Sequence, residues 1–513
     1  MSPELAGFAG APLPVVPGDC LLLRQACLAA ESTRRNGLEG LASRWERWCP
    51  SADWCERPAD RYRTALQSLQ EMPPISWAPG EEPPLSKTTA EEEWYSTVPD
   101  TDPLKLLLEE AARARAELLD VQCAAARELP GLLAETGLEL LAGHAGAGRW
   151  LSVELPRLAH APAAALDRVV PQFPAYQALL AAGDRYRTAS PAAPPPPGTA
   201  RLRTGRVGPG VTWLRARLAA EGIEAGLPES TRFDQGLRQA LRAFQQRHGL
   251  TPTGRPDRTT VEALAAGPGE RWQRIRAALA AWRRAVPPWE SSFVVVQVPQ
   301  AYVELYLDSR LVLRLKAVVG SAKREKDPES GSLEFLYRTL PLNSAITAIV
   351  VNPEWRIPST IVEREIEPAL AADPDYLERR NIRLEQFSSG AVRYVQEAGE
   401  RNAMGRLKFR FPNRHGFYLH DSPEKRLYRK VHRLHSHGCV RVDKAARLAE
   451  RILARDKGWN YDQLARTLKR GETREVALTT PLPIHIIYST AASDGDGQLS
   501  FYPDWYELET LPE

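Results

Sequence analysis

The hydrophobic residues of this 513-residue chain change their spacing at Phe293, and this change constrains the fold more than any other feature. Before it, apolar residues recur every three or four positions, as in "DPLKLLLEEAARARAELLDVQCAAARELPGLLAETGLELLAG" from Asp102, which is typical of amphipathic helices. After it, apolar and other residues alternate in 303–307 and 311–315, as in strands with one buried face. The chain is therefore predicted to be α+β, with helices first and a mainly-β domain last.

Boundaries along the chain follow from composition. The stretch "SPAAPPPPGTA" favours a stiff polyproline-type linker, and a chain of this length predicts about three domains. A polar segment between two predicted strands is long and helical in pattern, so we interpret it as a lid. The predicted parts are a helical scaffold domain (1–189), the linker (190–200), a compact three-helix module (201–266), a connecting helix (267–289) and the β domain (290–513), with the lid at about 359–401.

The charge balance and the apolar runs restrict the class of protein. Basic residues number 67 and acidic residues 64, so the surface is not that of a protein that coats nucleic acid. No run of 18 apolar residues exists, so no transmembrane segment is expected in this chain. The N-terminus, "MSPELAGFAGAPLPVVPGDC", lacks the basic and apolar regions of a signal peptide.

Six cysteines occur, and four of them lie close together near the N-terminus. Cys20 with Cys27 and Cys49 with Cys55 would fit two short-loop disulfides in an oxidising compartment. Free buried thiols fit the spacing equally well. Cys439 stands alone in sequence, which makes it a candidate for chemistry.

The stretch "SHGCVR" (436–441) follows "YLHD" (418–421) and combines the parts of an acyl-transfer site. Cys439 is a strong nucleophile as a thiolate, and His420 is a base that could take its proton. Gly438 lets the backbone approach a substrate closely, so neighbouring N–H groups could hold an oxyanion. A buried structural cysteine is the alternative without function.

A metal site is a further alternative. His435, His437 and Cys439 would share one face if a single strand ran through them, and these side chains bind zinc. Structural zinc sites favour paired ligands at longer spacing, and no second cysteine lies near. We therefore expect neither a metal nor an organic cofactor.

These residues resemble the signature of the L,D-transpeptidase (YkuD) family. In this chain the signature reads "YLHDSPEKRLYRKVHRLHSHGCVR", with a histidine, a spacer, and then Ser-His-Gly-Cys followed by Val-Arg. The resemblance extends over residues 290 to 507 and includes the turn "NPEW" at 352–355. It implies a mainly-β YkuD-like catalytic domain with a helical lid insertion.

Residues 201–266 resemble the small three-helix peptidoglycan-binding module. Phe244-Gln245 and Gly249-Leu250 match its pattern, and Leu241 replaces the commoner valine. Asp234 is a candidate N-cap for the helix that carries this pattern. An ordinary helical hairpin is the alternative, as is a module that has lost its affinity for glycan.

The family resemblance implies a peptidoglycan transpeptidase that forms 3→3 crosslinks between tetrapeptide stems through a thioester on Cys439. His420 would move the proton, and Asp421 or a backbone carbonyl would orient it. An L,D-carboxypeptidase or amidase, attachment of another protein to the wall, and a non-catalytic peptidoglycan-binding protein stay open as alternatives.

Other residues of the signature receive supporting roles on the same grounds. Ser436, Gly438 and His437 would shape the nucleophile loop and the oxyanion site. Arg441 would bind a stem carboxylate, or else form a structural salt bridge. Tyr418 and Trp355 would contact substrate, or else pack in the core.

The resemblance also implies partners and a location. The partners would be peptidoglycan stems and carbapenem-type β-lactam inhibitors, without nucleic acid. The location would be the periplasm or cell envelope, and the process peptidoglycan biosynthesis and cell shape.

Overall fold

The computed structural model describes residues 170–509, without 192, 228–229, 288–289, 328–329 and 494–497, and also positions 29, 34, 35, 43 and 44. Contacts divide the chain into two compact units, Met1–Val170 and Pro171–Glu513. Nearly all described residues belong to the second unit. The predictions for Cys20, Cys27, Cys49 and Cys55, and most of the helical scaffold, lie outside the described residues.

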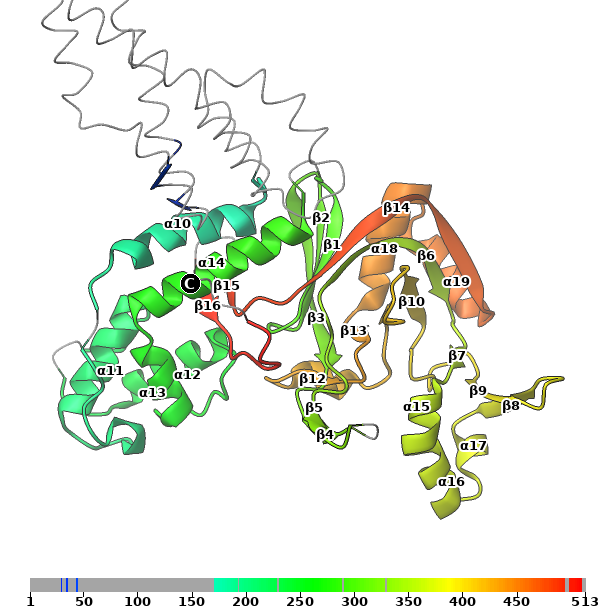
Figure 1. Cartoon of the computed structure of the whole chain (residues 1–513), viewed down its shortest axis with the longest axis horizontal. Helices are drawn as coiled ribbons and strands as arrows, with labels where there is room; N and C mark the ends of the chain where they lie inside the picture. The colour runs from blue at the N-terminus through cyan, green and yellow to red at the C-terminus, as the bar shows by residue number, and fades with distance from the viewer. Residues whose placement is uncertain are drawn as a thin grey trace, which may run out of the picture. The chain divides into compact units, whose positions relative to one another are not determined.

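Helices occupy the first part of the second unit (Figure 1). Asp234 caps one of them by accepting from the amide of Leu237 over 2.8 Å, which confirms the predicted cap. Among the residues that the structure describes, no helix is both long and apolar enough to cross a membrane. The elements are α10 (Pro174–Thr188), η1 (Thr199–Arg201), α11 (Pro209–Ala220), α12 (Gln235–Arg247), α13 (Arg258–Ala265) and α14 (Pro268–Ala285).

α11, α12 and α13 share one hydrophobic core, as the apolar spacing predicts. Leu214, Leu218, Leu237, Leu241 and Phe244 are completely buried in it. Such a core of leucine and phenylalanine stabilises the three helices against one another.

This three-helix module is fixed to the C-terminal strand β16 (Leu499–Phe501) by a close contact. The amide of Phe501 donates to Nδ1 of His248 over 3.0 Å, and the two rings stack with centroids 6.1 Å apart. Gly249 follows with φ +64°, and a Cβ there would lie 2.6 Å from the ring of Tyr502. The ring of Tyr502 thus packs directly on the backbone of the module at Gly249.

A closed sheet forms the second half of the unit. Its strands follow the order β3-β13-β11-β10-β6-β14-β1-β2, and β2 pairs again with β3, which closes a barrel with β12 added at β3. The bounds are β1 (Phe293–Gln297), β2 (Tyr302–Leu307), β3 (Arg310–Gly320), β6 (Leu342–Val351), β10 (Leu407–Arg410), β11 (Leu419–His420), β12 (Leu434–Ser436), β13 (Val440–Val442) and β14 (Arg474–Ile487). The prediction of an α+β chain is confirmed.

The sequence pattern predicts two strands between 293 and 320, and the structure has three. The turn between the two alternating stretches lies at Asp308 and Ser309, and both residues have positive φ, as a two-residue hairpin between β2 and β3 requires. The strand β1 was not predicted as a separate strand because all five of its residues are buried, so its sequence does not alternate between apolar and polar residues.

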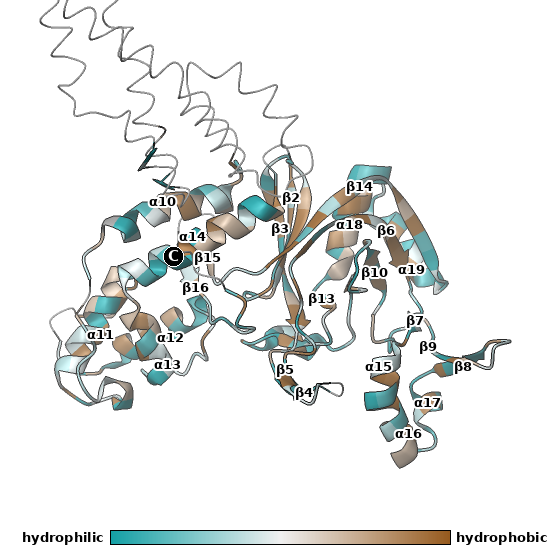
Figure 2. Cartoon of the chain, viewed as in Figure 1, coloured by the Kyte–Doolittle hydropathy of each residue, from teal (hydrophilic) through white to brown (hydrophobic). Residues whose placement is uncertain are grey.

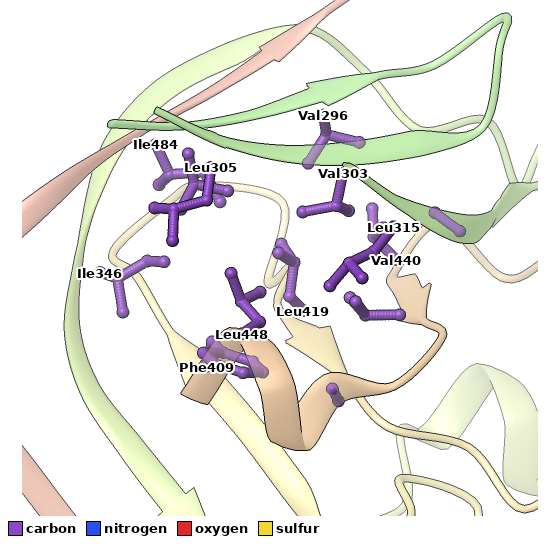
Figure 3. Packing of buried hydrophobic residues seen from close by; sticks show 14 of the residues in the cluster. Val296, Val303, Leu305, Leu315, Ile346, Phe409, Leu419, Val440, Leu448 and Ile484 are labelled. Carbon is purple, nitrogen blue, oxygen red and sulfur yellow. The ribbon is translucent and has the colours of Figure 1, made fainter. Parts of the chain in front are cut away.

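The barrel interior and helix α18 (Ala445–Lys457) form the main core. Figure 3 shows side chains from separate strands meeting there, including Leu305, Phe409, Leu419 and Ile484, with Leu448 from α18. Figure 2 shows hydrophobic colour on the barrel strands and hydrophilic colour on helix α19 (Tyr461–Arg470). Burial of apolar area on this scale holds the strands that carry the site.

The segment 359–401 is helical only in its first half. It begins with α15 (Ser359–Ile361), a π-helical turn η2 (Val362–Ile366), α16 (Glu367–Ala372) and α17 (Tyr376–Arg379). Two strands that the sequence analysis did not expect follow, β8 (Ile382–Gln386) and β9 (Val392–Gln396), and β9 pairs with β7 (Trp355–Arg356). Ile357, Val362, Ile366 and Ile382 give this segment a small core of its own. The remaining short strands are β4 (Glu325–Lys326), β5 (Leu333–Glu334) and β15 (Ala491–Ser493), and the remaining helix is η3 (Lys425–Arg429).

Candidate active site

Two neighbouring parallel strands bring the signature residues together. β11 pairs with β13 so that Leu419 lies opposite Val440, and both side chains are completely buried in the barrel core. Because side chains alternate along a strand, the residues on either side of this pair point away from the core. These outward residues are Tyr418 and His420, which flank Leu419, and Cys439 and Arg441, which flank Val440.

The outward residues line a cavity of about 1030 Å³. Trp355 from β7 and His437 from the loop before Cys439 also line it. Lid residues, among them Glu365 and Tyr376, complete the wall. The indole Nε1 of Trp355 is buried beside Tyr418, and its hydrogen bond to Tyr418 acts to lower the pKa of that phenol against the effect of burial.

Cys439 and His420 are both electrically neutral in this setting. Burial raises the pKa of the Cys439 thiol, against hydrogen bonding to Tyr418 and the positive charges of Lys408 and Arg441. Burial, aided by the charge of Arg441, lowers the pKa of His420 to about 3. Nδ1 of His420 is buried without a partner, and no hydrogen bond joins it to the thiol among the described residues. A buried neutral imidazole with an unused ring nitrogen is suited to receive a proton only as a reaction proceeds.

The loop before Cys439 is held by Ser436. Its hydroxyl donates to the carbonyl of Cys439 over 2.5 Å and accepts from the amide of Gly438 over 3.2 Å. The amide of Gly438, which the sequence assigned to an oxyanion site, is therefore already occupied. The amides of His437 and Cys439 have no hydrogen-bond partner within the described part of the chain.

A buried hydrogen-bond chain fixes the same loop from behind. Thr339 donates from its hydroxyl to the carbonyl of Gly438 over 2.7 Å and accepts from the amide of Gly320 over 2.8 Å. Tyr506 donates to the carbonyl of Gly320 over 2.6 Å. Sequence reasoning missed Thr339, because nothing local marks a hydroxyl whose partner lies 99 positions away.

The segment 359–401 contacts the loop before Cys439 directly. Glu365 in η2 forms an ion pair with Nε2 of His437 over 2.6 Å, and the hydrogen bond lowers the pKa of the Glu365 carboxyl. Arg364 donates to the hydroxyl of Tyr337 over 3.0 Å, and that ring meets the His437 ring edge-on. The sequence predicts a loop-supporting role for His437, but no local signal marks Glu365.

Two other predicted residues have partners of their own. Arg441 donates to Glu424 over 2.7 Å, so the salt-bridge alternative exists in this structure. Asp421 accepts from the amide of Arg406 over 3.1 Å and from Lys425 over 2.5 Å, and it makes no side-chain hydrogen bond to His420. Asp421 therefore holds the turn before β10, and the idea that its carboxylate orients His420 does not fit the geometry.

The zinc alternative required one strand through His435, His437 and Cys439. The chain instead leaves β12 at Ser436, turns at Gly438 with φ +107°, and enters β13 at Val440. Within the described ranges, no group of three or more His, Cys, Asp or Glu side chains is arranged to hold a metal ion.

Comparison with known proteins gives two family matches and one curated relative. Residues 291–467 match the family described as "L,D-transpeptidase catalytic domain" (YkuD), and residues 207–264 match "Putative peptidoglycan binding domain". A Haemophilus influenzae protein named "Putative L,D-transpeptidase" is 28% identical over 239 residues, which is 44% of this chain and 45% of that relative. The chain thus spans less than half the length of this relative.

Two solved structures are also similar. The crystal structure of the L,D-transpeptidase (residues 123–326) from Xylanimonas cellulosilytica has 18% identity and a TM-score of 0.18, and covers 58% of this chain and 100% of its own. That of the L,D-transpeptidase from Stackebrandtia nassauensis has 13% identity and a TM-score of 0.22, and covers 57% and 97%. These superpositions are too remote to add to the family matches. The chain is thus similar to the YkuD L,D-transpeptidase catalytic domain over residues 291–467, and to the peptidoglycan-binding domain over residues 207–264.

Proposed function

We propose that this chain is a peptidoglycan L,D-transpeptidase that forms 3→3 crosslinks, with Cys439 as the nucleophile and His420 as the proton carrier. The observation that carries the proposal is the outward placement of these two side chains from paired strands, into one cavity of about 1030 Å³. A cavity of this size has room for a peptide stem and a second, incoming stem.

The reaction would proceed in two acyl-transfer steps. The Cys439 thiol passes its proton to His420, and the sulfur attacks the carbonyl carbon between diaminopimelate and terminal D-alanine of one stem. The proton on His420 moves to the departing nitrogen, and D-alanine leaves a thioester behind. The side-chain amine of a second stem then attacks this thioester, gives up a proton through His420 and releases the thiolate as the new amide forms.

The oxyanion of each step would be held by backbone amides. The N–H groups of His437 and Cys439 are the available donors, since the amide of Gly438 is engaged by Ser436. Two amide donors beside the attacking sulfur are the usual means of stabilising this charge.

Cationic side chains suit the cavity to stem peptides, which carry several carboxylates. Arg338, Arg380 and Arg401 line it and have no carboxylate partner within the part of the chain that the structure describes. Guanidinium groups bind carboxylates by two parallel hydrogen bonds. We assign substrate contact to these arginines, to Trp355 and Tyr418, and to Arg441 once it releases Glu424.

The three-helix module would bind peptidoglycan, keep the catalytic domain on its substrate and hold the protein at the cell envelope; the match to a peptidoglycan-binding domain supports this part of the proposal. The carbapenem class of β-lactams would acylate Cys439, because it presents a strained carbonyl to the same nucleophile.

The test is intact-protein mass spectrometry after incubation with a carbapenem, and then with a disaccharide-tetrapeptide. We expect a covalent adduct that Cys439→Ala loses while keeping its fold, together with a crosslinked dimer that has lost D-alanine. An adduct with release of tripeptide alone would instead indicate a carboxypeptidase. Absence of any adduct in the parent protein would contradict the assignment of Cys439.

A further inference from the structure

Lys408 on β10 is a half-buried lysine without a carboxylate partner among the described residues. It lies directly opposite His420 in the pairing of β10 with β11. Its Nζ lies over the ring of Tyr418, 3.9 Å from the centroid. A lysine in this position would ordinarily either reach solvent or find an acid.

The place of Lys408 in the sheet puts it behind the candidate site and not within it. Its neighbours Leu407 and Phe409 are buried in the barrel core, so Lys408 shares the outward face with Tyr418 and His420. It does not line the cavity, which Tyr418 does. Lys408 thus contacts the ring of Tyr418 without itself lining the cavity.

Several of the charged groups nearest to Cys439 form ion pairs or are neutral. Arg441 on β13 is paired with Glu424, and His437 in the nucleophile loop is paired with Glu365 of the lid. Farther along β10, Arg410 is paired with Glu475 of β14. On β11, His420 and Tyr418 are uncharged, since burial keeps the pKa of the first far below neutral and that of the second far above it. Lys408 forms no ion pair among the described residues, and its charge lies against the ring of Tyr418.

A positive charge beside a buried sulfur favours the thiolate over the thiol, because the interior screens the attraction less than water does. We propose that Lys408 is a positioning residue whose charge, placed over the ring of Tyr418, stabilises the Cys439 thiolate. The thiol proton leaves to His420 or to solvent, and Lys408 keeps its own proton in this step; because burial lowers the pKa of Lys408, its charge acts near neutral pH and fades toward the alkaline end. The proposal shares with the proposed function only the identity of the nucleophile.

The test measures the reactivity of Cys439 in the full chain without any stem peptide. Iodoacetamide reacts with the thiolate, forming a carbon–sulfur bond and releasing iodide, and the modified peptide that contains Cys439 is quantified by mass spectrometry from pH 6 to 10. The variants are Lys408→Met, which keeps the aliphatic stem, Lys408→Gln as a second neutral form, and Lys408→Arg, which keeps the charge. Arg410→Met, two positions along the same face, is the matched control.

We expect both neutral variants to react about threefold to tenfold more slowly near pH 7.5, with profiles displaced to higher pH. At the alkaline end they should equal or exceed the parent, because a more basic thiolate is a stronger nucleophile. Lys408→Arg and Arg410→Met should follow the parent.

Profiles that do not move, or rates lowered equally at every pH, would overturn the proposal, since a packing role alone predicts the second result. Failure of the parent to crosslink stems would count against the proposed function and leave this measurement unaffected.

Discussion

The hydroxyl of Thr339 donates to the carbonyl of Gly438 over 2.7 Å, and so fixes the residue before the nucleophile. Thr339→Val keeps the shape and removes this bond, and it leaves the buried amide of Gly320 without its acceptor. We expect a loss of about 1–3 kcal/mol in unfolding free energy, and a larger fall in the acylation rate than in substrate affinity. Denaturant unfolding and carbapenem acylation kinetics measure the two effects. Thr347→Val, whose hydroxyl makes only an exposed 3.4 Å contact, is the control. Equal behaviour of the two variants would contradict this role for Thr339.

The pH dependence of Cys439 reactivity follows from the two neutral partners. The thiolate is the reactive form, and burial raises the pKa of the thiol, so the alkylation rate should still be rising above pH 8. His420, with a pKa of about 3, adds no step near neutral pH. A plateau that begins below pH 7 would reveal a resting thiolate–imidazolium pair and refute this expectation.

The ion pair between Glu365 and His437 should hold the lid closed. Both side chains are partly exposed, so the pair is worth less than about 1 kcal/mol, which corresponds to a change in lid opening of at most about fivefold. Glu365→Gln should raise the rate at which a bulky maleimide labels Cys439, relative to small iodoacetamide, by up to that factor. Glu363→Gln, an exposed neighbour without an ion pair among the described residues, should leave the ratio unchanged.

The contact between His248 and Phe501 should weaken in acid. Burial, with the charges of Arg247 and Arg271, keeps the pKa of His248 well below 6.5 in the fold, whereas the unfolded chain takes up a proton near 6.5. The contribution of His248 to the free energy of unfolding is therefore fully present above pH 6.5. Below that pH it falls by up to about 1.4 kcal/mol per pH unit. His248→Gln offers Phe501 an acceptor that does not titrate. The difference between the pH dependences of the two unfolding midpoints measures the effect, and identical dependences would show that His248 has no part in it.

Sequence patterns predicted those parts of the fold that depend on a single helix, strand or turn. Alternation in the strands predicted the β domain, and the cap of Asp234 and the turn at Asp308 and Ser309 are where the sequence indicates. The fully buried strand β1 and the hairpin of β8 and β9 were missed, since neither shows the alternation of a half-buried strand beside polar neighbours.

The site was predicted only as far as its signature extends. Cys439 and His420 could be predicted to share one site because both belong to the same short sequence signature. Thr339, Glu365 and Lys408 could not, because their relation to Cys439 depends on which strands the barrel sets side by side. The engagement of the Gly438 amide by Ser436 was equally hidden, since it depends on how tightly the loop turns.

The stacking of His248 on Phe501 has a consequence for reach. A binding module on a free tether samples many distances, and its effective concentration at the catalytic centre falls as the tether lengthens. Here the module and the barrel are parts of one compact unit. Any ligand that the module binds is therefore held at one fixed distance from Cys439. This fixed distance would then determine which peptide stems can reach the thiol, before the reaction itself can discriminate between them.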